Sequence, residues 1–429
     1  MIKTFNLIIL LVLFMTISPV FAEDENLLTL DKSIEIALKK NLAIRSAREA
    51  VKGAEYNKKS AFSDFLPKLS STYSYTRLDE EPSFSMGGTS YTTGAEDNYD
   101  FSLTLEQPVY TGRSLINIYE RAKLGIDISK IREDQARQDV ILEVKEAYFS
   151  ILKAEKIREV AEQSVRQIES HVRRAKEFYD AEMIPKNDLL QAEVQLAQAK
   201  QDMIKSDNGV NIAKSLFNTL LRRGINKEVT VEDILKYKPV NRDLNEFIAI
   251  AYRERPELKE LILSIEDAKK GIELSKSKYY PTVSLRGSYL KEGEEATVDE
   301  EESWNVMAIA QWTFWEWGKT GYQVSESRTG MARAEYAREQ MKDWITLEVK
   351  ESYLNIKEAE KNIFVAKKAI EQAEENFRMN EERYKEQIAT STEVLDAQTL
   401  LTQTRTNYYN ALNDYNIAKA RLERAIGVK

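Results

Sequence analysis

The chain has 429 residues, of which 42% are apolar and 31% charged, an ordinary balance for a folded protein of two or three domains. It contains no cysteine and a single histidine, His171, which excludes disulfides, thiolate metal sites and cysteine or serine–histidine nucleophiles. The net charge of -8 makes nucleic acid a poor candidate partner. We expect no enzyme activity, no cofactor and no metal, and the scarcity of glycine and proline predicts long uninterrupted elements.

The N-terminus has the pattern of a secretory signal peptide. Lys3 precedes an apolar run over Leu7–Ile17, and small residues end the segment at Ala22, just before Glu23. We therefore predict a signal peptide over residues 1–22. The alternative is a retained N-terminal anchor, although the run is short for a membrane-spanning helix. No later segment has 18 consecutive apolar residues, so a membrane protein with this sequence has to be a β-barrel.

An internal repeat organises the rest of the chain. Glu143–Tyr148 is closely similar to Glu348–Tyr353, and Asn211–Lys214 is identical to Asn416–Lys419, both at a spacing of 205 residues. Two matches at one spacing indicate two structural copies. The chain is therefore predicted to divide into a first repeat, a linker and a second repeat, over residues 23–223, 224–243 and 244–429.

Most of each repeat has the periodicity of a coiled coil. Residues from Val140 to Tyr179 and from Ile345 to Tyr384 alternate at spacings of four and three, and nearly all positions are apolar. The following segments, Leu189–Leu220 and Val394–Ala425, carry matching seams, which predicts an antiparallel helical hairpin in each repeat. A helix over about 113–181 would be roughly 100 Å long. Such a length indicates a rod or a tube.

Between the helices the periodicity changes to that of β-strands. Tyr99, Phe101, Leu103 and Leu105 alternate with polar residues, and the strand before them, around Leu69, alternates in the same way. The second repeat shows the same pattern. We expect one β-hairpin in each repeat, over about 68–107 and 282–314, with connecting loops over 79–97 and 291–302.

Strands of about ten residues with one apolar and one polar face are typical of transmembrane β-barrels. The alternative is a half-buried hairpin in a soluble sheet. Four strands cannot enclose a lumen, and an open sheet edge in lipid leaves unpaired backbone groups, so several chains have to contribute. Twelve strands leave a water channel whereas eight are filled by side chains, which favours a trimer over a dimer.

Several short motifs, in this order, resemble the TolC-like family of outer-membrane efflux proteins. They are the opening segment, the helix-to-strand junctions, the strand-to-helix turn and the start of the second repeat, at Leu28–Asn41, Leu66-Pro67, Tyr280-Pro281, Gln107–Arg113 and Arg255–Leu258. The resemblance covers essentially the whole mature chain. Its specificity comes from the order of the motifs and from the duplicated layout.

The resemblance implies a mostly α-helical homotrimer located in the outer membrane. Four strands per chain would form one twelve-stranded barrel in outer-membrane lipid, and twelve helices would continue it as a periplasmic tunnel. The function would be passive exit of substrates in efflux or type I secretion. The substrates would be delivered by an inner-membrane pump through a periplasmic adaptor, and the pump would supply the energy.

The same resemblance assigns roles to the two hairpin tips. Family members commonly have glycine where Glu182 and Gln387 stand here. The adaptor would contact the tips, at Met183, Ile184, Pro185 and Lys186 in the first repeat and Ile388, Ala389, Thr390 and Ser391 in the second.

Acidic residues near the tips match positions that line the constricted mouth of the tunnel in the family. They are Asp188, Glu393 and Asp396, and Tyr384 matches an aromatic position near the gate. In a trimer each carboxylate becomes a ring of three, which would favour cations over anions.

A plainer interpretation stays open for each of these residues. Asp188 and Glu393 would lie in the first turn of a helix, with Asn187 and Thr392 as caps, where acidic residues favour the helix dipole. Tyr384 is the last position of the apolar seam that begins at Ile345, so packing in the core is the alternative to a role in the gate.

Three other features have a functional and a structural interpretation. The acidic segment Glu292–Glu302 would bind divalent cations or be a solvated loop. His171 lies off the seam and is predicted to be an ordinary surface residue. Four tryptophans would form a girdle at the membrane interface or pack at the helix junction, namely Trp304, Trp312, Trp315 and Trp317.

Two rival functions remain to be compared with an exit channel. A soluble periplasmic coiled-coil scaffold would explain the signal peptide and the heptads but leaves the strands without a purpose. A periplasmic hydrolase would need a catalytic constellation, and no segment of this sequence places two carboxylates in a convincing cleft.

Overall fold

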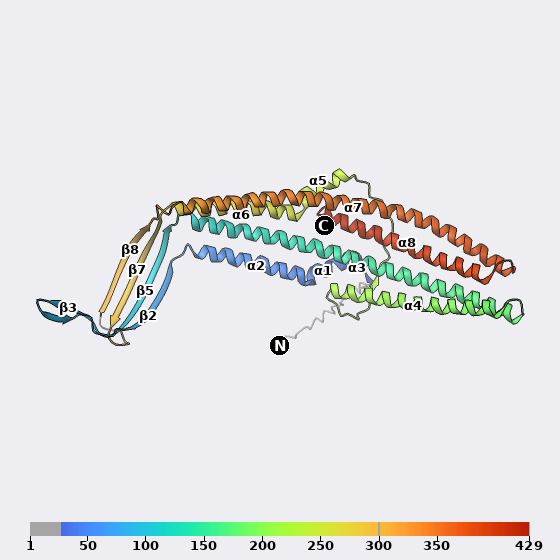
Figure 1. The fold of residues 1–429 in the computed structure, drawn as a ribbon, viewed down its shortest axis with the longest axis horizontal. Coiled ribbons are helices and arrows are strands. Elements are labelled where there is room, and N and C mark those ends of the chain that lie inside the picture. The colour runs from blue at the N-terminus through green and yellow to red at the C-terminus, as the bar shows by residue number, and fades with distance from the viewer. Residues whose placement is uncertain (1–26, 299–300, 429) are drawn as a thin grey trace, which may run out of the picture.

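The computed structural model describes residues 27–298 and 301–428, and the chain forms a long rod (Figure 1). The strands lie at one end and the tips of two helical hairpins at the other, with the C-terminus near the middle. The predicted signal peptide and Glu23 lie outside the described residues. Within the described part, no helix combines the length and apolarity needed to cross a lipid bilayer.

Both repeats contain a short helix, a second helix, a pair of long strands, a 67-residue helix and a 35-residue return helix in the same order, and the β3–β4 hairpin (residues 83–92) occurs in the first repeat. The first contains β1 (Leu27–Leu28), α1 (Leu30–Lys40), α2 (Leu42–Ser63), β2 (Lys68–Arg77), β3 (Ser83–Met86), β4 (Thr89–Thr92), β5 (Asp97–Tyr110), α3 (Ser114–Asp180) and α4 (Lys186–Leu220). After it come β6 (Thr230–Val231), α5 (Leu244–Glu254), α6 (Pro256–Lys276), the 3-10 helix η1 (Ser277–Tyr279), β7 (Thr282–Gly293), β8 (Glu301–Gln311), α7 (Lys319–Lys385) and α8 (Ser391–Ala425).

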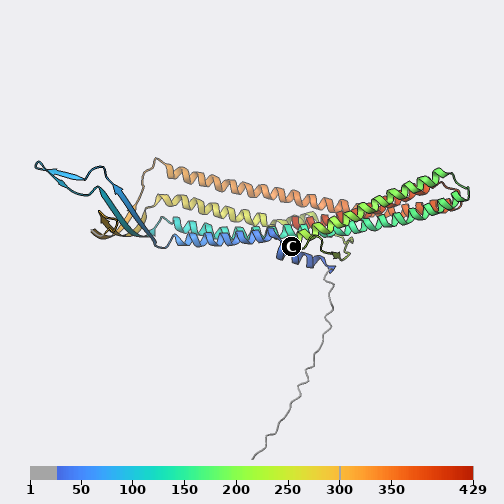
Figure 2. The same cartoon turned by 90° about the horizontal axis from the view of Figure 1, so that it is seen from below.

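Two unbroken helices, α3 and α7, run most of the length of the rod. Each has 67 residues, hence a length of roughly 100 Å. Their packing partners change half-way: α3 lies against α2 and then α4, and α7 lies against α6 and then α8. Since α3 also contacts α6 and α8, the helices form one curved layer with α2/α4 at one edge and α7 at the other (Figure 2).

The four long strands form one antiparallel sheet in the order β2-β5-β7-β8. The register places Leu103 opposite Tyr289, and Tyr289 opposite Trp304, so the predicted apolar positions of both hairpins share one face. The other face is polar and carries an ion pair between Arg286 and Glu106, 3.0 Å apart. The predicted division into an apolar and a polar face is therefore confirmed by the register.

Three parts of the connecting segments differ from the prediction. The loop expected over 79–97 contains the β3–β4 hairpin, because Gly87 and Gly88 adopt positive φ angles of 66° and 91° and allow a two-residue turn. The loop expected over 291–302 is shorter, since β7 continues to Gly293 and β8 begins at Glu301. The linker over 224–243 contributes β6, which pairs in parallel with β1.

Backbone conformations repeat along with the sequence. Positive φ angles occur 205 residues apart at Arg113 and Gly318, where the long helices begin, and at Glu182 and Gln387, where they end. At Gly112 a β-carbon would lie 2.4 Å from the carbonyl oxygen of Ser277, so this strand-to-helix turn requires glycine.

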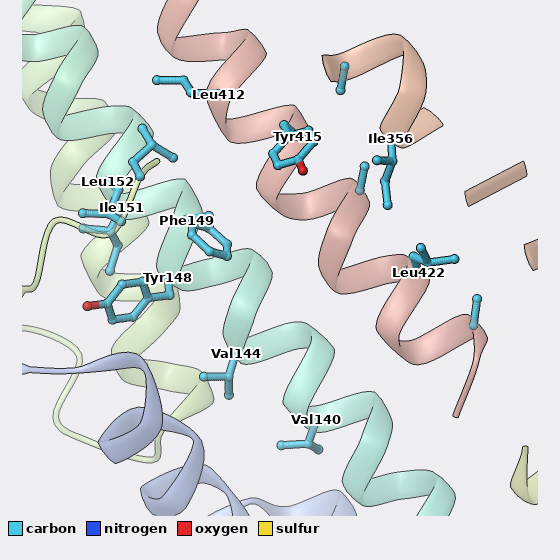
Figure 3. Close-up of a cluster of buried hydrophobic side chains, with 14 of the residues drawn as sticks. Val140, Val144, Tyr148, Phe149, Ile151, Leu152, Ile356, Leu412, Tyr415 and Leu422 are labelled. Carbon is cyan, nitrogen blue, oxygen red and sulfur yellow. The ribbon is translucent and has the colours of Figure 1, made fainter. Parts of the chain in front are cut away.

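A buried tyrosine joins the core of the rod to the β1–β6 pair. Tyr148 comes from the duplicated Glu143–Tyr148 motif and is fully buried between α3 and its neighbours (Figure 3). Its hydroxyl oxygen lies 3.1 Å from the carbonyl oxygen of Leu28 and 3.0 Å from that of Glu232. Burial raises the pKa of Tyr148 to about 12. The equivalent Tyr353 is only half-buried, so the tyrosine of the first copy alone anchors this edge of the fold.

We expect Tyr148→Phe to destabilise the β1–β6 pair by about 1–3 kcal/mol, because a buried carbonyl loses its donor. Amide hydrogen exchange at Leu28 and Val231 measures the effect, and exchange at both should accelerate. Tyr353→Phe is the matched control, since this half-buried residue occupies the same place in the second repeat. Equal effects of the two substitutions would contradict the anchoring role.

Candidate functional site

The reversal at both hairpin tips depends on one residue in the left-handed region. Glu182 has φ of 56° and Gln387 has φ of 61°. The amide of the next residue, Met183, donates to the carbonyl oxygen of Phe178 at 2.8 Å, and an equivalent bond of the same length closes the second tip. These bonds form a Schellman motif. They hold a conformation that costs a residue with a side chain about 1–2 kcal/mol.

The second return helix begins with a capping box. Thr390 is the N-cap, its hydroxyl accepts from the amide of Glu393 at 3.3 Å, and the Glu393 carboxylate accepts from the amide of Thr390 at 2.7 Å. The Thr390 amide and hydroxyl hold the pKa of Glu393 below its usual value. The structure therefore shows the capping interpretation for Glu393, but the cap is Thr390 and not Thr392, which lies inside α8.

The first return helix cannot form the same box. Its N-cap is Pro185, which has no amide hydrogen, and Asn187, the predicted cap, lies inside α4. Asp188 stands where Glu393 stands in the other copy, yet none of the described residues gives its carboxylate a hydrogen bond or an ion pair. Asp188 is half-buried, so a partly desolvated carboxylate remains available at this tip.

Asp396 and Tyr384 differ sharply in their surroundings. Asp396 is exposed on α8, and no side chain in the described part of the structure pairs with it. Tyr384 is 3% exposed and packs against His171 and Phe178, with ring centroids 4.8 and 5.4 Å away. Burial, and then the negative charge of Asp188, raise the pKa of Tyr384. Core packing therefore accounts for the placement of Tyr384.

His171 is a buried residue, and its predicted surface position is wrong. Only 5% of it is exposed, and its Nε2 lies 2.8 Å from the hydroxyl oxygen of Ser391. The prediction failed because α3 packs against α8 as well as α4, and the apolar seam identifies only the α4 side. Ser391 is itself 1% exposed, which removes it from the surface that an adaptor could contact. Met183 and Ile388, by contrast, are 51% and 69% exposed.

Polar side chains join the two hairpins along their length. Besides His171 and Ser391, the pairs are Gln167–Gln398 at 3.0 Å, Arg174–Glu381 at 3.3 Å, Gln163–Arg405 at 2.9 Å, Ser164–Thr402 at 3.3 Å and Gln191–Thr392 at 3.2 Å. Within each hairpin the contacts are the apolar seams. The interface between hairpins thus combines these polar pairs with the buried aromatic contact of Tyr384 on His171 and Phe178.

The candidate residues also lack the arrangement of a metal centre. No group of three or more His, Asp or Glu side chains in the described residues is placed to hold a metal ion.

Comparison with known families decides the identity of the chain. The family model described as "Outer membrane efflux protein" matches residues 33–216 and 248–428, one segment in each repeat. The chain belongs to the outer membrane efflux protein family. It is therefore an efflux channel of the outer membrane, from a family of channels and not of enzymes. The family match favours the exit channel over the soluble periplasmic scaffold.

Solved structures of similar fold extend over nearly the whole efflux protein. The Campylobacter jejuni CmeC outer membrane channel has a TM-score of 0.78 at 16% identity, covering 93% of this chain and 85% of that one. The outer membrane protein VceC from Vibrio cholerae has 0.77 at 15%, covering 93% and 96%. The Neisseria gonorrhoeae MtrE outer membrane channel in its open state has 0.74 at 19%, covering 93% and 89%. No curated protein matches the sequence.

The contact between hairpins should weaken in mild acid through His171. Burial, and then the charge of Arg174, lower its pKa to about 4, while Glu381 opposes the shift. The unfolded chain, with a histidine pKa near 6.5, takes up the proton first as the pH falls, so stability is lost between about pH 6.5 and 4 at up to about 1.4 kcal/mol per pH unit.

Hydrogen exchange near Ser391 and Tyr384, compared at pH 7 and pH 5 after correction for intrinsic rates, tests this effect. His171→Gln keeps a group able to bond the Ser391 hydroxyl and removes the titration, so its exchange should depend less on pH. Identical pH profiles for the two proteins would show that His171 does not control this contact.

Proposed function

We propose that three copies of this efflux protein form one continuous exit channel. Its outer part would be a closed twelve-stranded barrel, and its inner part a tunnel of twelve helices. The observation that carries the proposal is the open sheet. Strands β2 and β8 each have an unpaired edge among the described residues. In lipid such an edge is costly, and pairing β8 of one copy with β2 of the next would satisfy it.

The helical layer supports the same assembly. Its two outer edges are α4 and α7, and both expose large apolar side chains. Val194, Ile204 and Leu216 on α4 are 70%, 70% and 64% exposed, and Phe364 and Val365 on α7 are 55% and 69% exposed. Contact between α7 of one copy and α4 of the next would cover both edges, and a head-to-tail contact of this kind closes into a ring.

Aromatic residues support placement of the sheet in the membrane. Trp304 lies near the start of β8, next to the loop. Trp312, Trp315 and Trp317 lie between the end of β8 and the start of α7, and all four side chains are more than half exposed. The eight residue-to-residue steps from Trp304 to Trp312 span roughly 27 Å in an extended chain. This length matches the apolar band of about 25 Å between the aromatic girdles of outer-membrane barrels.

The hairpin tips are proposed to receive the periplasmic adaptor, and through it an inner-membrane pump that supplies the energy. Support comes from the exposure of Met183 and Ile388, two apolar side chains at the end of the rod farthest from the sheet. The proposed contact set, from which burial removes Ser391, is Met183, Ile184, Pro185, Lys186, Ile388, Ala389 and Thr390.

The constriction is proposed to depend on Asp188 and Asp396. Neither carboxylate has a partner in the described structure, so both are free to act on ions. Glu393 contributes less because its carboxylate already accepts the Thr390 amide. Tyr384 is proposed to shape the constriction from within the packed core, without touching the ions itself.

Mass determination tests the assembly. Outer membranes from cells that produce the full chain are extracted in detergent, and the mass of the purified protein is measured by light scattering. A trimer that appears only after detergent extraction supports the shared barrel. A monomer, or a protein released from the periplasm without detergent, would contradict it.

We expect Asp188→Asn combined with Asp396→Asn to lower the cation-to-anion permeability ratio about twofold or more, because two rings of charge are lost. Single-channel recording in planar bilayers under a salt gradient measures the ratio. Glu393→Gln is the comparison: it removes one charge per chain, from the capping box, so it is compared with each of the single variants Asp188→Asn and Asp396→Asn as well as with the double variant. If Glu393→Gln lost cation selectivity while the double variant kept it, Glu393 would be the residue that sets selectivity, and the assignment to Asp188 and Asp396 would be wrong.

A further inference from the structure

A cavity of about 490 Å³ lies half-way along the rod, where α1 and the segment over 232–240, here called the equatorial strap, cover the seam between α3 and α8. Figure 3 shows Phe149 on α3 and Tyr415 on α8, which both line it. The remaining apolar lining is Leu30, Ile34, Ile141, Ile234 and Ala420. Small-molecule sites in proteins commonly have volumes of about 300–1,000 Å³ and such a lining.

The rim of this cavity is positively charged in a chain whose net charge is -8. Four lysines line it against two carboxylates. Lys145 is paired with Glu423 at 2.7 Å. None of the described residues gives a hydrogen bond or an ion pair to the ammonium groups of the other three, which are Lys236, Lys238 and Lys419. The cavity therefore combines an apolar floor with three lysines that make no ion pair among the described residues, beside the single further carboxylate of Asp31.

Comparison of the two repeats explains why Lys419 has no partner. Its equivalent in the first copy, Lys214, makes an ion pair with Glu155 at 2.9 Å. The residue equivalent to Glu155 is Glu360, and its carboxylate accepts from the hydroxyl of Tyr237 and pairs with Lys357 at 3.0 Å. Tyr237 belongs to the equatorial strap, which has no second copy. Glu360 therefore contacts the strap and Lys357, and Lys419 lacks the ion pair that Lys214 makes in the first copy.

We propose that this equatorial cavity binds a single-chain anionic amphiphile, with its acyl chain against the apolar floor and its carboxylate among Lys236, Lys238 and Lys419. The apolar floor distinguishes such a ligand from a simple anion, which would find no advantage there. The lining residues belong to α1, α3, the strap and α8.

Binding at this place would couple the strap to the helices. The Tyr415 hydroxyl already donates to the carbonyl oxygen of Lys238 at 2.5 Å, which fastens the strap to α8. A carboxylate shared by strap lysines and by Lys419 of α8 would add a second link across the same junction. The ligand therefore stabilises the middle of the rod, where α2 and α6 end and α4 and α8 become the packing partners of α3 and α7.

Octanoate is a suitable probe, with the protein held in amphipol so that free micelles do not compete. Isothermal titration should give saturable binding of octanoate to the intact chain and weaker binding of the uncharged octanamide and the cationic octylamine. Combined replacement by glutamine, Lys236→Gln with Lys238→Gln and Lys419→Gln, should weaken octanoate binding about tenfold or more, since several charge contacts are lost together.

Lys214→Gln is the matched control, because it removes the same charge from the identical motif of the first repeat, where Glu155 is the partner. It should bind octanoate like the unaltered chain. Ile34→Gln should weaken octanoate and octanamide alike, and circular dichroism melts should show that each variant is folded. Equal octanoate affinity in the triple variant and in Lys214→Gln, or equal binding of octylamine and octanoate, would overturn the proposal.

Discussion

The continuity of α3 and α7 is the constraint on which the rest of this fold depends. Each helix runs unbroken over 67 residues, while the helices packed against it stop and restart near the middle of the rod. Every interrupted helix needs a capped end, and a buried end without partners is costly. The strap, the β1–β6 pair and the C-terminal turn all meet at this level, where Arg255, 5% exposed, bonds the carbonyl oxygen of Ala425.

The two kinds of interface in the rod have different strengths for a physical reason. Separating the two helices of a hairpin exposes the apolar side chains of their seams to water. This exposure costs a free energy of roughly 25 cal/mol per Å² of apolar surface. The polar pairs between hairpins, such as Gln167 with Gln398, exchange one hydrogen bond for another when they separate, which costs about 1 kcal/mol each. The contact between the hairpins therefore depends on these polar pairs together with Tyr384, which is buried against His171 and Phe178.

The sequence predicted the features that apolar periodicity encodes. The 4,3 seams, the long helix over about 113–181 and the two faces of the sheet agree with the structure, because each buries apolar residues at a fixed spacing. His171 and Ser391 were missed since they lie on a second, polar seam, which hydrophobicity does not reveal. Pairing of Leu27 with Thr230 depends on two residues distant in sequence, and two-residue strands carry no periodicity.

The duplicated sequence serves as an internal control for function. Where the copies agree, as in the left-handed turns at Glu182 and Gln387, the residues serve a shape that both need. Where they differ, a charged group lacks the partner that its equivalent has: Pro185 in place of Thr390 gives Asp188 no amide to bond, and Lys419 lacks the ion pair that Lys214 makes with Glu155. Both differences place uncompensated charge at a surface. Charge without a structural partner is what an ion or a ligand can use.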